Sequence, residues 1–277
     1  MNGATVLIKF VGDTKDVNSK MNGLSKATGS VTKGFIAGSI ITKGLSTAFN
    51  MMSSSAGDAA KRLDTMNNYP KVMKNFGVSA DEASASVKRI DESVRGLPTS
   101  LNDAVAGVQD IFMVTNNLPK AEKMFRAIND SAMVFANGST EASKRFIYAY
   151  KQSLAAGKVS AQDFNQMNEA IPGLMAKVSA SMGMTYAELK QGLSDGSISI
   201  DQFNQALQNL DEKGGAGMKS LQESAKTATG GIQTAITNMK TAITRGLANA
   251  FDTLDKSLQD AGLGGISGVI NDIGKAF

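Results

Sequence analysis

The residue types that most often carry enzyme chemistry are missing from this chain of 277 residues, which contains neither histidine nor cysteine. Without histidine it lacks the commonest general base, the commonest metal ligand and every Ser–His or Cys–His pairing. Without cysteine it has no disulfide, no thiolate zinc site and no thiol nucleophile. We therefore predict a non-enzymatic protein with no catalytic, cofactor-binding or metal-binding residues.

Pairs of adjacent acids are the remaining candidates for acid–base work: Asp81/Glu82, Asp91/Glu92 and Asp211/Glu212. Adjacent residues on a helix do not share a face, so the two members of a pair cannot act together on one substrate. We interpret these acids as solvated helix surface or capping groups. Tyr148 and Tyr150, two positions apart, should point to different sides of a helix for the same reason.

The segment SDGSISIDQF, residues 194–203, resembles the second half of a calcium-binding EF-hand loop. Calcium would require acids at the first and third loop positions and a bidentate glutamate at the twelfth. The chain has Gln191, Leu193 and Gln202 at those positions. We interpret the segment as the capped start of a helix.

Two further glycine-rich segments each lack a feature of the nucleotide-binding motif that they resemble. In GGAGMKS, residues 214–220, Met218 separates the glycine from Lys-Ser, whereas a phosphate-binding loop needs them adjacent. GLGGISG, residues 262–268, follows no predicted strand and so does not match a dinucleotide-binding turn. We interpret the first segment as a flexible hinge and predict no cofactor.

The net charge of +4 is unevenly distributed. Residues 1–69 hold 8 basic and 4 acidic side chains, residues 70–212 hold 14 and 16, and residues 213–277 hold 7 and 5. No segment is basic enough to form a dedicated nucleic-acid face, so we predict no sequence-specific nucleic-acid binding.

Two apolar stretches support an alternative function, a membrane-active protein that is pore-forming or secreted. They are residues 34–49 and 262–277. The uninterrupted apolar run of the first stops at Lys43, short of the roughly 20 residues that span a bilayer. A packing helix is therefore the favoured interpretation, and the N-terminus lacks the basic region and cleavage site of a signal peptide.

Residue periodicity predicts a mainly α fold. Val6, Ile8 and Phe10 alternate like a short N-terminal strand, which would need a pairing partner. Residues 13–68 then follow a helical pattern. All prolines lie between positions 70 and 172, where they punctuate shorter helices.

The strongest local pattern is a repeated helix start, in which a hydroxyl residue is followed three positions later by an acid or amide. The pairs are Ser79/Glu82, Ser160/Asp163, Thr185/Glu188 and Ser199/Gln202. Two of these starts are similar over ten residues, GKVSAQDFNQ at 157–166 and GSISIDQFNQ at 196–205, which suggests a duplicated helix–turn unit.

Three regions follow from these patterns. Residues 1–69 form the N-terminal strand and a long helix, and residues 70–212 form a compact multi-helix domain. Residues 213–277 form a long amphipathic helical arm, whose apolar stripe suits packing against a like partner. Because the end is glycine-rich and apolar, we expect this arm to be truncated.

Four motifs occur in a specific order and spacing. They are Gly-Leu-Pro before a capped helix at 96–98, Gln-x4-Gly-Lys-Val-Ser at 152–160, Asn-Glu-Ala-Ile-Pro-Gly-Leu at 168–174 and Gly-x-Ile-Ser-x-x-x-Phe at 196–203. Together they resemble the N-terminal domain of bacteriophage tail tape-measure proteins over about residues 60–250. No single motif is chemically diagnostic; the ordered set is specific.

The resemblance implies a structural protein of the virion, located in the lumen of the tail tube and, during assembly, in the host cytoplasm. Such proteins set tail length, template polymerisation of the tube protein and take part in genome ejection. The implied partners are the tail tube protein, tail assembly chaperones, distal tail or baseplate proteins, further copies in a helical bundle and the host membrane during ejection.

The length of the chain departs from the family pattern, because family members are usually far longer. One helix of 277 residues would reach only about 415 Å at 1.5 Å per residue. The chain is then either a fragment or shortened product, which we favour, or part of a short tail.

Overall fold

The computed structural model describes residues 37–229, 232–260, 262 and 264–275, and their backbone is almost entirely helical. Within these residues the elements are α2 (Ala37–Lys74), α3 (Ala80–Ser93), α4 (Leu101–Thr115), α5 (Leu118–Phe135), α6 (Thr140–Ala156), α7 (Ala161–Ala170), α8 (Leu174–Ser181), α9 (Tyr186–Asp195), α10 (Ile200–Lys213), α11 (Leu221–Ala228), α12 (Ile232–Asp260) and α13 (Gly265–Lys275). The predicted mainly α fold is confirmed. The predicted strand at Val6–Phe10 lies outside the described residues.

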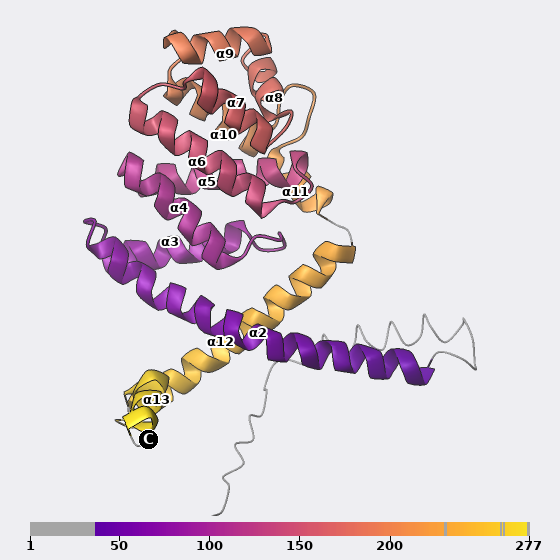
Figure 1. Ribbon diagram of the computed structural model, residues 1–277, viewed down its shortest axis with the longest axis vertical. Coiled ribbons are helices and arrows are strands. Elements are labelled where there is room, and N and C mark those ends of the chain that lie inside the picture. The colour runs from indigo at the N-terminus through magenta and orange to yellow at the C-terminus, as the bar shows by residue number, and fades with distance from the viewer. Residues whose placement is uncertain (1–36, 230–231, 261, 263, 276–277) are drawn as a thin grey trace, which may run out of the picture.

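Long and short helices are segregated in space. α3 to α11 stack into a compact body, whereas α2 and α12 cross one another below it (Figure 1). The two helices are in contact where they cross, because Ala59 of α2 is buried together with Leu247 and Ala248 of α12. Long helices therefore flank a compact multi-helix region, as predicted.

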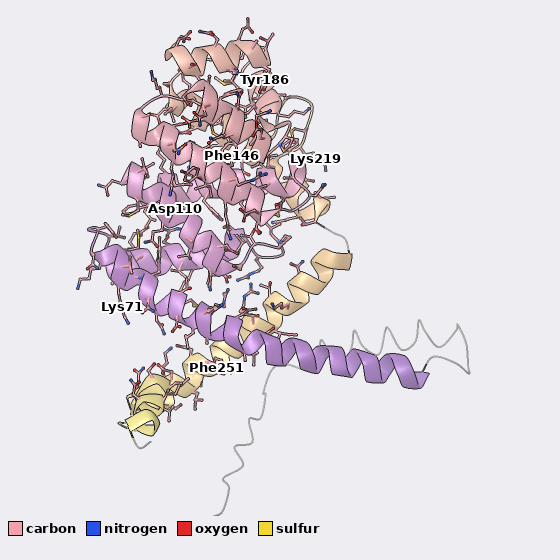
Figure 2. All side chains as sticks on the ribbon, in the orientation of Figure 1. Lys71, Asp110, Phe146, Tyr186, Lys219 and Phe251 are labelled. Atoms are coloured by element: carbon pink, nitrogen blue, oxygen red, sulfur yellow. The ribbon has the colours of Figure 1, made fainter. Side chains whose placement is uncertain are left out.

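One hydrophobic core holds the compact body together. It runs from Tyr69, near the end of α2, to Ala225 in α11. Phe146 lies inside the stack, and Phe251 lies on α12 away from it (Figure 2). The predicted division at residues 69/70 and 212/213 stays a prediction, but α11 lies in this core although it follows residue 212.

The predicted helix starts are present, and two carry both reciprocal hydrogen bonds. The Ser199 hydroxyl accepts from the Gln202 amide at 3.1 Å, and the Gln202 side chain accepts from the Ser199 amide at 2.8 Å. Thr185 and Glu188 form the same capping box. The amide and hydroxyl of Thr185 both donate to the Glu188 carboxylate, which lowers the pKa of Glu188.

In the other two helix starts the hydroxyl cap forms, but the acid three residues later does not accept from the backbone amide of the cap residue. Ser79 and Ser160 accept from the amides three residues on. The Asp163 carboxylate turns to the Ser160 hydroxyl at 2.7 Å, because aspartate is too short to reach the backbone. Glu82 instead binds Arg89.

The two similar ten-residue segments adopt the same local structure. Gly157 and Gly196 both have left-handed φ angles, of 70° and 84°, where each ends a helix. Phe164 and Phe203, at matching positions of α7 and α10, are both completely buried. A left-handed glycine, a hydroxyl cap and one anchoring aromatic ring are thus used twice.

The prolines do not all mark helix boundaries. Pro119 lies in the first turn of α5, where its missing N–H costs nothing. Pro70 lies inside α2, four residues before its end. The proline therefore does not separate the long helix from the compact body, and α2 continues into the core through Tyr69 and Met73.

Candidate functional site

A groove of about 700 Å³ lies between α3, α5 and α11. Ile90, Leu97 and Phe125 contribute apolar surface, and most of the other lining residues are charged, with both signs present. Since acidic and basic groups are interspersed, the groove does not favour a ligand of one charge.

Arg89 of α3 joins two acids on the rim of this groove. Its Nε lies 2.8 Å from Glu122 Oε2 of α5, and its Nη2 lies 2.6 Å from Glu82 Oε1 of its own helix. The hydrogen bond with Glu122 is the main cause that raises the pKa of Arg89. The network bridges α3 and α5 at the surface.

A second network lies deeper, where α5, α10 and α11 meet. Arg126 Nε of α5 donates to Asp211 Oδ2 of α10 at 3.0 Å, and Arg126 Nη2 lies 2.9 Å from Glu212 Oε1. Gln222 of α11 donates to the same Asp211 oxygen at 3.1 Å. One arginine thus bridges both members of an adjacent acid pair.

The structure corrects our interpretation of two acid pairs. The Asp211 side chain is only 1% exposed, and the Asp91 side chain is 14% exposed. Neither is a solvated surface group, because inter-helix packing encloses them with arginines. Glu212, at 38% exposed, does remain at the surface.

Asp130 is a site residue that sequence patterns did not identify. It lines the groove, is buried and lies one helical turn after Arg126 on α5. Burial, followed by the charge of Asp211, raises the pKa of Asp130 well above its ordinary value. Burial likewise raises the pKa of Asp211, although Arg126 opposes this. The four-residue spacing of Arg126 and Asp130 was the one available sequence clue.

Asp91 forms a third network, which joins the long helices to the compact body. Its Oδ1 lies 2.9 Å from Arg62 Nη2 of α2 and 3.6 Å from Arg245 Nη2 of α12. Its Oδ2 lies 3.7 Å from Arg95 Nη2. One carboxylate of α3 therefore faces three guanidinium groups from different parts of the chain.

Replacing Asp91 with asparagine is expected to loosen the crossing of α2 and α12, because three cations would lose their shared anion. We expect a loss of about 1–2 kcal/mol, less than for a fully buried pair, since two of the contacts are long. The chain has no cysteine, so spin labels on cysteines at exposed Lys61 and Asn249 would report the inter-helix distance. The distance distribution should broaden in the variant, and a matched Asp110→Asn variant should leave it unchanged.

The structure also shows where the tyrosine pair and two of the glycine-rich segments lie. Tyr148 is 60% exposed and Tyr150 is completely buried, so the prediction that they point to different sides is confirmed. Ser199 caps α10 within the EF-hand-like segment, as predicted. Gly215 and Met218 exchange two backbone hydrogen bonds of 3.0 Å, so the predicted hinge contains a closed turn.

The described residues include neither a cluster of metal ligands nor a membrane-spanning helix. Among them, no three or more acidic side chains gather in a way that could hold a metal ion. None of the described helices has the length and apolarity needed to cross a membrane; the stretch at 34–49 begins before the first described residue.

Comparison with protein families decides the identity. A family model described as "Tape measure protein" matches residues 57–256. The chain belongs to the tape measure protein family. The match begins within α2 and ends within α12, so it includes the crossing and the whole compact body. No curated protein and no solved structure matches the chain.

Membership of the tape measure family gives the chain a role in the phage tail. Tape measure proteins are structural components of the virion tail rather than an enzyme family. The networks described above fit this class. Asp211 is enclosed by Arg126 and Gln222, so it holds helices together and does not present a reactive group to the groove.

Proposed function

We propose that this tape measure protein acts in the lumen of the tail tube, where it sets tail length, templates tube assembly and takes part in genome ejection. The observation that carries the proposal is the family match over residues 57–256. The long helices provide a physical means of measuring length. A helix has a fixed rise per residue, so the number of residues translates into distance.

The long and short helices differ in what an added residue would do. α2 has 38 residues and α12 has 29, corresponding to about 57 Å and 43 Å at 1.5 Å per residue. In the compact body the longest helix entirely within it, α5, has 18 residues. Chain added to a loop of that body would bulge outward without lengthening it. Among the described helices, α2 and α12 are therefore the ruler segments that we propose.

The same proposal includes the partners of the tape measure. The tail tube protein would polymerise around the extended helices, with tail assembly chaperones covering them beforehand. Distal tail or baseplate proteins would bind at one end, and further copies would pack alongside in a bundle. The host membrane would be met during ejection. The compact body, with its own core, is suited to be the anchor.

The ruler role is tested by an insertion in α12. Thirty-six helix-forming residues, ten full turns, placed between exposed Thr253 and Leu254 should lengthen tails by up to about 54 Å. Ten turns keep the downstream residues on their original face. Tail lengths would be measured by electron microscopy of virions made with the variant gene.

A matched insertion separates the effect of a longer helix from the effect of added residues as such. The same residues placed between exposed Gly157 and Lys158, in the loop joining α6 and α7, should leave tail length unchanged. Unchanged tails with the α12 insertion would contradict the ruler role of this helix. The membrane-active alternative stays a hypothesis, under which the purified chain would release dye from liposomes.

A further inference from the structure

Two buried carboxyl groups lie together where α5, α10 and α11 meet. Asp130 of α5 is 3% exposed and Asp211 of α10 is fully buried. Arg126 joins them, because its Nε binds Asp211 at 3.0 Å and Asp130 follows Arg126 by one turn of α5. Each has one oxygen, Oδ1, that is buried and has no hydrogen-bond partner. Two ionised carboxylates offer only acceptors, so neither could satisfy the other.

One proton would resolve this arrangement. If one carboxyl is protonated, its O–H can donate to the other group, and the missing donor is supplied. We propose that Asp130 and Asp211 share one proton in the folded protein, and that this proton fixes α11 against α5 and α10. The pair is thus a pH-sensitive clamp built into the compact body.

The charges around the pair agree with a single shared proton. With it, the buried site holds one negative charge opposite Arg126, at a hydrogen-bond distance of 3.0 Å. Without it, two buried negative charges would face that one cation. Glu212 of α10 is partly exposed. The other charged groups line the adjoining groove, where water screens them; they are Glu82, Arg89 and Glu92 of α3, Glu122 and Lys123 of α5, and Lys226 of α11.

α11 is the element most sensitive to this proton. It has 8 residues, too few to be stable as an isolated helix. Leu221 and Ala225 bury its apolar side, and Gln222 binds Asp211. If both carboxyls were ionised, water would have to enter to solvate the second charge. Among α5, α10 and α11, the shortest helix is α11, so we expect α11 to open and admit that water. α12 follows α11 along the chain.

The direction of the pH dependence follows from proton linkage. Burial raises the pKa of Asp130 in the folded state, whereas the unfolded chain releases its carboxyl protons in the ordinary range. The folded state therefore binds more protons between the ordinary pKa and the raised one. The free energy of the local opening that exposes the pair should fall as pH rises through this interval. The equilibrium constant for that opening should rise by up to about tenfold per pH unit per proton.

Hydrogen exchange across a pH series from about 5 to 9 tests the clamp in the full chain. After correction for intrinsic exchange, protection of amides in Leu221–Ala228 should fall by up to about tenfold per pH unit in the titrating interval. Amides of α6 serve as the internal reference. In Asp130→Asn, whose amide donates a hydrogen without titrating, the protection should stay constant.

The controls make the result decisive. Asp110→Asn, which changes a side chain that is 54% exposed, should behave like the unaltered protein. Infrared spectra should show the C=O stretch of one protonated carboxylic acid at a pH where exposed acids are ionised, and Asp130→Asn should lose it. Absence of that band in the unaltered protein, or the same pH dependence in Asp130→Asn, would overturn the proposal. The infrared result stands even if the variant fails to fold.

Discussion

Replacing Phe203 with alanine should destabilise the compact body by about 3–5 kcal/mol, the usual loss for a buried phenylalanine. The ring is completely buried on α10, and α10 packs on α5, α8 and α11. Removal leaves a cavity where several helices meet. Because a domain is stable by only about 5–15 kcal/mol, this loss is a large share of the total.

Guanidinium unfolding followed by far-ultraviolet circular dichroism measures the effect. The midpoint should fall while the slope stays the same, since the surface exposed on unfolding is little changed. Tyr148→Ala is the matched control, because Tyr148 is 60% exposed and its loss should change stability by less than about 0.5 kcal/mol. Equal effects of the two substitutions would show that Phe203 does not anchor the core.

Replacing Gly214 with alanine should destabilise the turn between α10 and α11 by about 3–4 kcal/mol. Gly214 has a φ of 77° and a ψ of −165°, a region that residues with a β-carbon avoid. A β-carbon there would lie 2.5 Å from the Met218 carbonyl oxygen and 2.7 Å from the Lys219 carbonyl carbon. These are backbone atoms, so they cannot move aside unless the turn opens.

Gly217→Ala provides the comparison, because it shares the φ of 77° but has no atom within 4 Å of an added β-carbon. It should cost only the conformational strain, about 1–2 kcal/mol. Thermal unfolding of both variants would separate strain from collision. Equal losses would mean that the turn adapts and the close approach is not restrictive.

Helix starts could be predicted because a helix cap is a local feature of the sequence. A cap such as Ser199 with Gln202 is completed within four residues, so the sequence contains all its atoms in order. Tyr148 and Tyr150 were placed on opposite sides for the same reason, since helical geometry fixes their relation. The absence of histidine and cysteine needs no structure at all.

Contacts between helices could not be predicted in this way. Arg126 and Asp211 are 85 positions apart, and Asp91 meets arginines of α2 and α12. Whether an acid is solvated or buried depends on which helix faces then pack together, and acid pairs alone do not specify that. Pro70 is similar, because the core contacts of Tyr69 and Met73 keep α2 helical through a residue that usually ends helices.

The sequence by itself therefore determined a mainly helical chain without histidine or cysteine, the positions of its capped helix starts and, through the ordered motifs, its resemblance to the tape measure family. Tertiary structure alone decided that α2 and α12 cross, that α11 belongs to the core and that Asp130 lies beside Asp211. The physical reason is the separation along the sequence of the residues that interact. Caps and left-handed glycines are satisfied within a few residues, whereas burial and charge pairing depend on segments that meet only after folding.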